Sequence, residues 1–389
     1  MAKKKLIYLD NAATSFPKPE QVYKKMDYCM RNIGANPGRS GHRMAIKADE
    51  MIYKTRETIK NLFNISNSEN IIFTSNATMA LNFGIKGILQ KGDEVVTSTI
   101  EHNSVFRPLM QLKKKGIKIV FVPCSEYGFL DPDDVKKAVN KKTKLIIVNH
   151  ASNVTGTITP IREIGKIAKR SGVIFFIDAA QTAGSISIDV KRDYIDVLAC
   201  SGHKSLLGPQ GTGVLYVRPG LKLKSVIEGG TGSSSESENQ PELLPDKLES
   251  GTLNTAGIVG LGAGVDFILK TGLDKIISKK RFLAKKLLKD LESLNGIKIY
   301  GPKDPDKIVP VVSFSMNSID PSEVGCLLDE RFAIMTRVGL HCSPLAHKTI
   351  GSFPKGTVRV SMGYFNTEED INYLINSIKS VLNQYSAKS

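Results

Sequence analysis

The stretch VIFFIDAAQTAGSISIDVKRDYIDVLACSGHK (173–204) contains two apolar, β-rich runs that each end in polar residues. VIFFIDAAQ (173–181) predicts one strand, and DVLACSGHK (196–204) predicts the next. LIIVNHASN (145–153) and EVVTSTIEHNS (94–104) have the same form further upstream. Because helical stretches separate these runs, the sequence predicts an α/β fold with a mostly parallel sheet and helices on both faces.

One of the intervening helices, near residues 160–171, has clear end signals. Thr159 is a suitable capping residue, and Pro160 suits the first helical position. Gly172 follows the last turn, where glycine commonly ends a helix.

The second half of the chain changes in character. GGTGSSSESENQPE (229–242) predicts a solvated surface loop, with a lid or an inter-subunit arm as alternatives. Long helices are predicted from about residue 255 to 295, and short strands then alternate with helices. We therefore predict a large domain of residues 20–260 and a smaller α+β domain of residues 261–389, with the N-terminal arm 1–19 packed on it.

The formal net charge of +16 raises the question of nucleic-acid binding. No nucleic-acid-binding motif accompanies the charge, and the lysines are spread over helix faces, as in KKRFLAKKLLKDLESL (279–294). The predicted buried stripe of that helix is Phe282, Leu283, Leu287, Leu288, Leu291 and Leu294. We expect no nucleic-acid partner, and instead a preference for anionic ligands and acidic proteins.

The five cysteines favour a reduced protein without a structural metal. They form no C-x-x-C pair and are odd in number, which argues against a disulfide framework or a zinc site. Cys200 and Cys326 are expected in the core, and Cys342 in a loop. No apolar run is long enough to span a membrane, and the lysine-rich start does not resemble a signal peptide. We expect a cytoplasmic protein with no membrane partner.

Polar residues follow the predicted strands at the sheet edge where α/β proteins bind ligands. Asp178 and Gln181 end one strand, and Ser201, His203 and Lys204 end the next. A lysine amine and a carboxylate are what pyridoxal 5'-phosphate (PLP) requires, for a Schiff base and for its pyridinium nitrogen. Each residue alone has an ordinary surface role, but together with the following GPQGTGVLYV they favour a PLP site.

A phosphate site is expected at FTSNATMALNFGI (73–85), which predicts a strand end, a turn and a helix start. The backbone N–H groups of Ala77 and Thr78 and the Thr78 hydroxyl would face an anion there, and Asn76 or Ser75 would cap the helix. His102, at another strand end, is a candidate to stack on the cofactor ring and relay protons.

The order of motifs along nearly the whole chain resembles that of class-V aminotransferase-fold enzymes, and the match is to the cysteine desulfurases, including the selenocysteine-lyase-like group. The motifs are YLDNAAT (8–14), EHNS (101–104), HASNVTGT (150–157), IDAAQTAG (177–184), SGHKSLLGPQGTGVLYV (201–217), SGTLNTAGI (250–258), RVGLHC (337–342) and VRVSMGYFNT (358–367). This resemblance implies fold type I of the PLP-dependent transferases.

The resemblance also implies roles for individual residues. The implied cofactor ligands are Lys204 as the Schiff base, Asp178 at the pyridinium, Gln181 at the phenolic oxygen, His102 and Asn153 beside the ring, Thr78, Ser201 and His203 at the phosphate, and Thr252 reaching the phosphate from a neighbouring subunit. Arg359 would bind the substrate carboxylate, and His42 would lie near the substrate. A homodimer follows from the role of Thr252.

Cys342 would be the sulfur acceptor, since a loop thiol beside His341 and Arg337 is in a setting that favours a thiolate. L-Cysteine would become L-alanine, and Cys342 would pass its persulfide to a sulfur-acceptor protein, for iron–sulfur clusters or other thio-cofactors. Selenocysteine lyase activity on L-selenocysteine is a close alternative. A class-V lyase, aminotransferase or epimerase with an idle Cys342, and a non-catalytic sulfur-carrier scaffold or basic binding module, also stay open.

Overall fold

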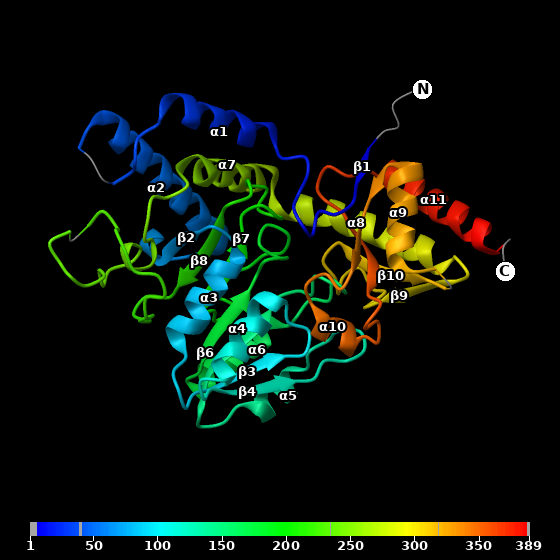
Figure 1. Cartoon of the computed structure of the whole chain (residues 1–389), viewed down its shortest axis with the longest axis horizontal. Helices are drawn as coiled ribbons and strands as arrows, with labels where there is room; N and C mark the ends of the chain where they lie inside the picture. Colours follow the sequence, from blue (N-terminus) through cyan, green and yellow to red (C-terminus); the bar gives the residue numbers. More distant parts are fainter. Residues whose placement is uncertain (1–5, 39–40, 234, 318, 387–389) are drawn as a thin grey trace.

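A seven-stranded sheet lies at the centre of the first two thirds of the chain (Figure 1). The computed structural model describes residues 6–38, 41–233, 235–317 and 319–386. The strands, in sheet order, are β2 (Ile71–Thr74), β8 (Gly213–Val217), β7 (Val197–Ser201), β6 (Ile174–Asp178), β5 (Thr143–Asn149), β3 (Glu94–Ser98) and β4 (Lys118–Val122). The run from β7 to β4 is parallel, and β8 is antiparallel to both neighbours. The predicted α/β fold with a mostly parallel sheet is confirmed.

Helices cover both faces of this sheet, which explains why β6 and β7 are buried along their whole length. One face packs against α3 (Ala77–Ile88) and α4 (Asn103–Lys113). The other packs against α2 (Arg43–Phe63), α6 (Ile161–Ser171) and α7 (Thr255–Thr271). The remaining helices of this part are α1 (Glu20–Asn32), the short α5 (Pro132–Ala138) and two 3-10 turns, Ser68–Asn70 and Asp246–Leu248.

The predicted helix near 160–171 is α6 (Ile161–Ser171), and its start differs from the prediction by one residue. Pro160 is the capping residue rather than the first helical one, and it forms no side-chain cap. Gly172 ends the helix with a φ of 65°, as glycine is expected to do.

A second, antiparallel sheet forms the last third of the chain. Its strands, in sheet order, are β12 (Arg337–Gly339), β13 (Thr357–Ser361), β10 (Val311–Met316) and β9 (Ile297–Tyr300). The helices of this part are α8 (Leu273–Glu292), α9 (Pro321–Phe332), α10 (Pro344–Thr349) and α11 (Glu368–Ser386). Residues of α8, α9 and α11 share one apolar core with this sheet, in an α+β arrangement.

The N-terminal arm lies against both sheets. Strand β1 (Ile7–Tyr8) pairs in parallel with β11 (Ile334–Met335), and Leu9 is fully buried in the core of the second sheet. A few residues later, the Ser15 N–H donates to the His203 carbonyl oxygen at 3.0 Å, beside the first sheet. The arm is therefore a structural link between the two parts of the chain.

Helix α7 packs on α1 and α2. The predicted domain division after residue 260 falls inside α7, and the division stays a prediction. Residues 1–5 of the N-terminal arm, which include Lys3, Lys4 and Lys5, lie outside the described residues.

Helix α8 corrects one prediction. Leu283, Leu287, Leu288 and Leu291 are buried as expected, and Leu294 is half-buried. Phe282 is 53% exposed, because it is turned about 100° from Leu283 around the helix. Lys280, which is not part of the predicted buried stripe, is only 6% exposed.

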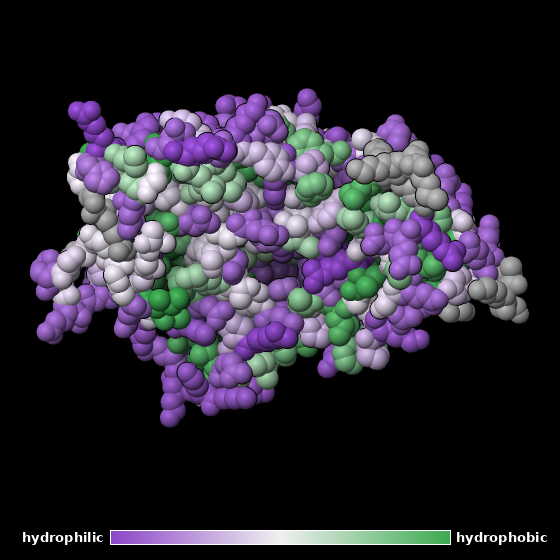
Figure 2. Space-filling view, turned by 45° about the horizontal axis from the view of Figure 1, so that its top comes forward, coloured by the Kyte–Doolittle hydropathy of each residue, from purple (hydrophilic) through white to green (hydrophobic). Residues whose placement is uncertain are grey.

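Most described residues of the segment 229–242 are exposed and none is buried, as predicted for a surface loop. Figure 2 shows hydrophilic side chains over most of one face of the molecule, interrupted by separate hydrophobic areas. Among the described residues, no single helix is long and apolar enough to cross a membrane. Helices α7 and α8 reach that limit only as a pair, which is bent by 86°.

Candidate active site

A cavity of about 140 Å³ lies beyond the carboxyl ends of β5, β6 and β7. Nine predicted site residues line it: Ala77, Thr78, His102, Asn153, Asp178, Gln181, Ser201, His203 and Lys204. Six other residues also line it: Asn76, which was predicted only as a possible helix cap, and Leu81, Ser104, Asn149, Ala151 and Ala180, for which no role was predicted. Parallel strands place these side chains together because their carboxyl ends meet at one edge of the sheet.

Lys204 and Asp178 influence each other's charge across this cavity. Burial is the largest effect on Lys204 and lowers its pKa to about 8, although the charge of Asp178 opposes the shift. Burial also raises the pKa of Asp178, against a hydrogen bond from the Ala180 N–H at 2.9 Å and the charge of Lys204. An amine with a pKa near 8 is partly unprotonated at neutral pH, so it can act as a nucleophile or a base.

The N-terminus of α3 opens into the same cavity. Asn76 caps this helix by accepting the Met79 N–H at 2.9 Å, as one predicted alternative had it. The Thr78 hydroxyl lies 2.7 Å from the Ser104 hydroxyl. Gly213 makes the approach of this turn possible, because a Cβ there would collide with the Asn76 backbone. An anion at this point would meet free helix N–H groups and hydroxyls.

His102 is held as a neutral ring. Its Nδ1 accepts the Ser104 N–H at 3.1 Å, which leaves the ring proton on Nε2. Burial first, and then the positive charge of Lys204, lower its pKa to about 3. A neutral imidazole at this position suits stacking on another aromatic ring.

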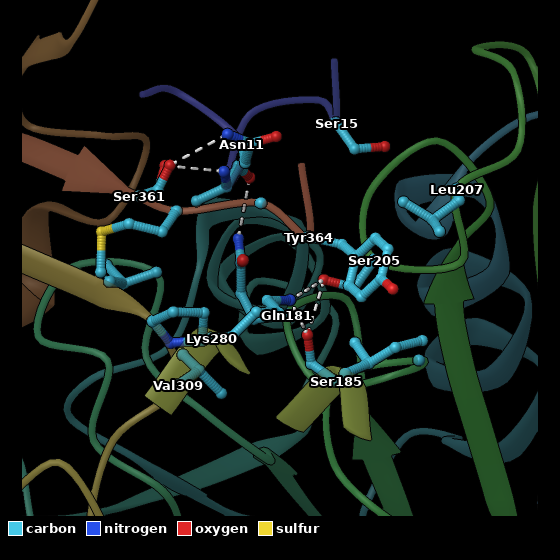
Figure 3. Close-up of a pocket in the computed structure, with 17 residues that line it drawn as sticks. Asn11, Ser15, Gln181, Ser185, Ser205, Leu207, Lys280, Val309, Ser361 and Tyr364 are labelled. Atoms are coloured by element: carbon cyan, nitrogen blue, oxygen red, sulfur yellow. Dashed lines mark hydrogen bonds between the residues drawn. The ribbon is translucent and has the colours of Figure 1, made fainter. Parts of the chain in front are cut away.

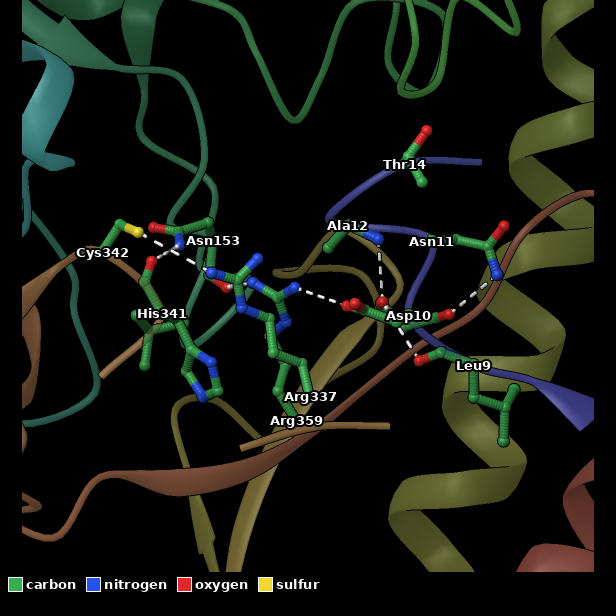
Figure 4. Close-up of polar contacts among 12 residues, drawn as sticks. Leu9, Asp10, Asn11, Ala12, Thr14, Asn153, Arg337, His341, Cys342 and Arg359 are labelled. Carbon is green, nitrogen blue, oxygen red and sulfur yellow. Dashed lines mark hydrogen bonds and ion pairs between the residues drawn. The ribbon is translucent and has the colours of Figure 1, made fainter. Parts of the chain in front are cut away.

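Arg359, on β13, is 1% exposed and lies outside the cavity lining (Figure 4). It donates from Nη2 to Asp10 Oδ1 at 2.7 Å and from Nη1 to the Asn153 carbonyl oxygen at 3.0 Å. Its Nε has no partner among the described residues. Asp10 thus accepts one hydrogen bond of the guanidinium. No role was predicted for Asp10, although it lies in the YLDNAAT motif.

Cys342 is exposed in a loop, as predicted, and hydrogen bonds tie this loop to the cavity. Asn153 donates to the His341 carbonyl oxygen at 2.7 Å and accepts the Ser343 hydroxyl at 2.7 Å. The Cys342 carbonyl oxygen also accepts the Asn103 N–H at 2.9 Å. Nη2 of Arg337 lies 3.7 Å from the sulfur, and Figure 4 shows both arginines beside this loop.

The other cysteines are placed differently. Cys29 and Cys200 are buried, and Cys124 is half-buried. The prediction of a core position for Cys326 is wrong, because its side chain is exposed on α9.

Two predicted site residues do not reach the cavity of their own chain. Thr252 is exposed, and its hydroxyl accepts a bond from Asn36 at 3.4 Å. His42 is also exposed and caps α2 by accepting the Ala45 N–H at 3.3 Å. Neither lines the cavity of Lys204, so a role for them there requires a second subunit.

Glu101 is a buried acid that the sequence analysis did not assign. It accepts the Asn149 N–H at 3.1 Å, and burial raises its pKa to about 8. It stands immediately before His102 in the quoted EHNS motif, but nothing in the sequence distinguishes a buried glutamate from an exposed one.

Comparison with known proteins gives a consistent result. The class-V aminotransferase family model matches residues 7–374. A probable cysteine desulfurase of Pyrococcus abyssi is 37% identical, covering 97% of this chain and 94% of the relative. One of Methanothermobacter thermautotrophicus is 36% identical, covering 96% and 94%. The solved apo structure of a cysteine desulfurase from Thermococcus onnurineus NA1 is 34% identical and has a TM-score of 0.92, covering 97% of this chain and 95% of that one.

The matches extend over almost the full length of both partners and include the strand ends that form the cavity of Lys204 and Asp178. They agree with the predicted type I fold of the PLP-dependent transferases. The chain belongs to the class-V aminotransferase family, as one of its cysteine desulfurases.

Proposed function

We propose that the protein is a PLP-dependent cysteine desulfurase that transfers the sulfur of L-cysteine to Cys342. One C–S bond of the substrate breaks and one S–S bond forms, so that L-cysteine and the Cys342 thiol yield L-alanine and a Cys342 persulfide. The observation that carries this proposal is the pair of hydrogen bonds between Asn153, in the cavity wall, and the loop that bears Cys342.

The residues of the cavity fit PLP. An amine and a carboxylate face the same space, and hydroxyls and helix N–H groups are available for a phosphate. The buried Nδ1 of His203 has no partner among the described residues, which suits a group that would receive an anion. When bound, PLP supplies an electron sink for negative charge on the α-carbon of an amino acid.

The chain's own residues then have separate tasks. Lys204 would hold the cofactor covalently and take the α-proton on its Nζ, which its lowered pKa permits. Arg359 would bind the substrate carboxylate, with Asp10 and Asn153 fixing the guanidinium plane. Nη2 of Arg337 lies 3.7 Å from the Cys342 sulfur and would help to hold it in place.

Replacing Arg359 by alanine is expected to lower kcat/KM for L-cysteine by about 30-fold to several thousand-fold. Loss of one partner of a buried charged pair costs about 2–5 kcal/mol, and each factor of ten corresponds to about 1.4 kcal/mol. Steady-state kinetics check this, with Arg170→Ala as a control because that arginine is exposed on α6. A change below about threefold would place the substrate carboxylate elsewhere.

The protein is further expected to be a homodimer. Thr252 does not reach its own cavity, and large hydrophobic residues are exposed on α1 and α2. They are Tyr23, Tyr28, Met30, Met44, Ile46 and Tyr53. A cluster of exposed hydrophobic side chains is typical of an interaction surface.

Light scattering should therefore give twice the mass of the chain. Tyr28→Glu is expected to shift the protein toward the monomer and to reduce activity. Tyr127→Glu, at an exposed tyrosine outside these helices, should leave the dimer intact. A wild-type monomer with full activity would contradict the role of Thr252.

The test of the proposed function is the measurement of sulfide and alanine from L-cysteine in the presence of a reductant. Equal amounts of both products are expected.

Parallel reactions with L-selenocysteine measure the preference between sulfur and selenium, and the sulfur-acceptor protein is to be identified by its gain of persulfide. A coloured protein that makes no alanine from L-cysteine would favour another class-V reaction, and a colourless one would favour a scaffold.

A further inference from the structure

Lys280 is a buried lysine without a counter-charge. It projects from α8 into the space between the two parts of the chain and is 6% exposed. Its Nζ donates to the Ser185 hydroxyl and, at 3.3 Å, to the Ser205 hydroxyl. No carboxylate of the described residues forms an ion pair with it, and burial alone lowers its pKa to about 8. Lys204 differs in this respect, because Asp178 opposes the effect of its burial.

The hydrogen bonds around Lys280 leave donors unused. Ser185 donates its hydroxyl proton to Ser205 Oγ at 2.8 Å, and the oxygens of both serines accept hydrogen bonds from Lys280. An ammonium has three N–H donors, and a serine hydroxyl has one. Within the described residues, one N–H of Lys280 and the hydroxyl proton of Ser205 therefore have no acceptor.

These groups line a pocket that is partly open to solvent and has about 20 Å³ of inner space (Figure 3). This volume is enough for a single species of the size of a water molecule. Gln181 lines both this space and the cavity of Lys204, so the two are neighbours. Gly184 brings the two serine-bearing loops together, because a Cβ at this position would collide with the Ser205 carbonyl oxygen.

We propose that this space binds one small monovalent anion, of which chloride is the common example, with Lys280 as its counter-ion. A buried ammonium is costly without a negative partner, and the surroundings offer only hydroxyls and amides. The unused donors of Lys280 and Ser205 both suit an anion. The inner space of about 20 Å³ suits a small anion.

The site is tested on the purified full-length protein by ³⁵Cl line broadening in NMR and by thermal unfolding. Chloride is added at constant ionic strength against potassium gluconate, whose anion is too large to enter. We expect saturable broadening that bromide reverses, and a rise in Tm of about 2 °C at ten times the dissociation constant.

Lys280→Met keeps the length of the side chain and removes its charge, and it should abolish both responses. Lys285→Met is the matched control, since Lys285 is exposed on the same helix. Equal broadening in all three proteins, or broadening without saturation, would mean that Lys280 is neutral beside a water molecule and would overturn the proposal.

A bromide-soaked crystal of the unaltered protein gives an independent answer if Lys280→Met does not fold. An anomalous peak within hydrogen-bond distance of Lys280 Nζ is the expected result, and no peak there would refute the site. Neither measurement depends on turnover of L-cysteine, so this inference and the proposed function can fail separately.

Discussion

Cys342→Ser is expected to bind L-cysteine but to release no alanine from it, a loss of at least about 10³-fold. Lys204, Asp178 and the phosphate-binding residues do not involve the thiol, so cofactor binding and the colour of the protein should be unchanged. Sulfur transfer needs a nucleophile at the substrate sulfur, and a serine hydroxyl is a far weaker nucleophile there than a cysteine sulfur.

Two measurements check this expectation. Alanine production should fall to background in Cys342→Ser and stay normal in Cys326→Ser, which removes the other exposed cysteine. Wild-type protein exposed to L-cysteine without reductant should gain the mass of one sulfur atom on the peptide that contains Cys342, and thiols should remove it. If Cys342→Ser forms alanine at the wild-type rate, a class-V reaction without a catalytic thiol replaces the desulfurase mechanism.

Lys204→Ala is expected to lose covalent attachment of the cofactor and to lose turnover by at least about 10³-fold. The structure makes this a demanding test, because burial also lowers the pKa values of Lys18 and Lys280 to about 8. Three amines with lowered pKa values are thus chemically able to form a Schiff base, but Lys204 alone among them lines the same cavity as Asp178.

Borohydride reduction followed by peptide mapping separates the three amines. The reduced cofactor should be found on the Lys204 peptide of the wild type and on no peptide of Lys204→Ala. Lys285→Ala, at an exposed lysine, should behave as the wild type. Label on Lys18 or Lys280 in the wild type would show that the assignment of Lys204 is wrong.

The central sheet and the residues at its strand ends were predictable because both depend on local patterns. Apolar runs that end in polar residues mark the strands, and parallel strands bring their carboxyl ends together. Asp178 and Lys204 could therefore be paired from the sequence alone, before any tertiary contact was known.

The residues that escaped prediction depend on contacts between distant segments. Asp10 meets Arg359 across 349 positions of the chain, and no local pattern indicates such a pair. Cys326 lies among apolar residues on α9, but that side of the helix is turned to solvent. Thr252 does not line the cavity of Lys204 in its own chain, and its predicted place is in the cavity of a second subunit.

Lys280 is a different case, because the spacing of apolar residues along the helix indicates a buried position although lysine is charged. Residues 276, 280, 283, 287 and 291 follow the i, i+3, i+4 spacing of one helix face, and all of them are buried. Helix periodicity alone would have placed Lys280 inside. The predicted buried stripe contained only apolar residues, because lysine generally prefers solvent.

The N-terminal arm has a consequence for how the protein is made. A ribosome produces Asp10 349 residues before its partner Arg359 on β13. Domains generally fold from the N-terminus during synthesis, at about 5–20 residues per second. The central sheet, whose last strand in the sequence is β8, can therefore form before Arg359 is translated. A nascent chain that does not yet include β13 has a complete central sheet but lacks the ion pair between Asp10 and Arg359.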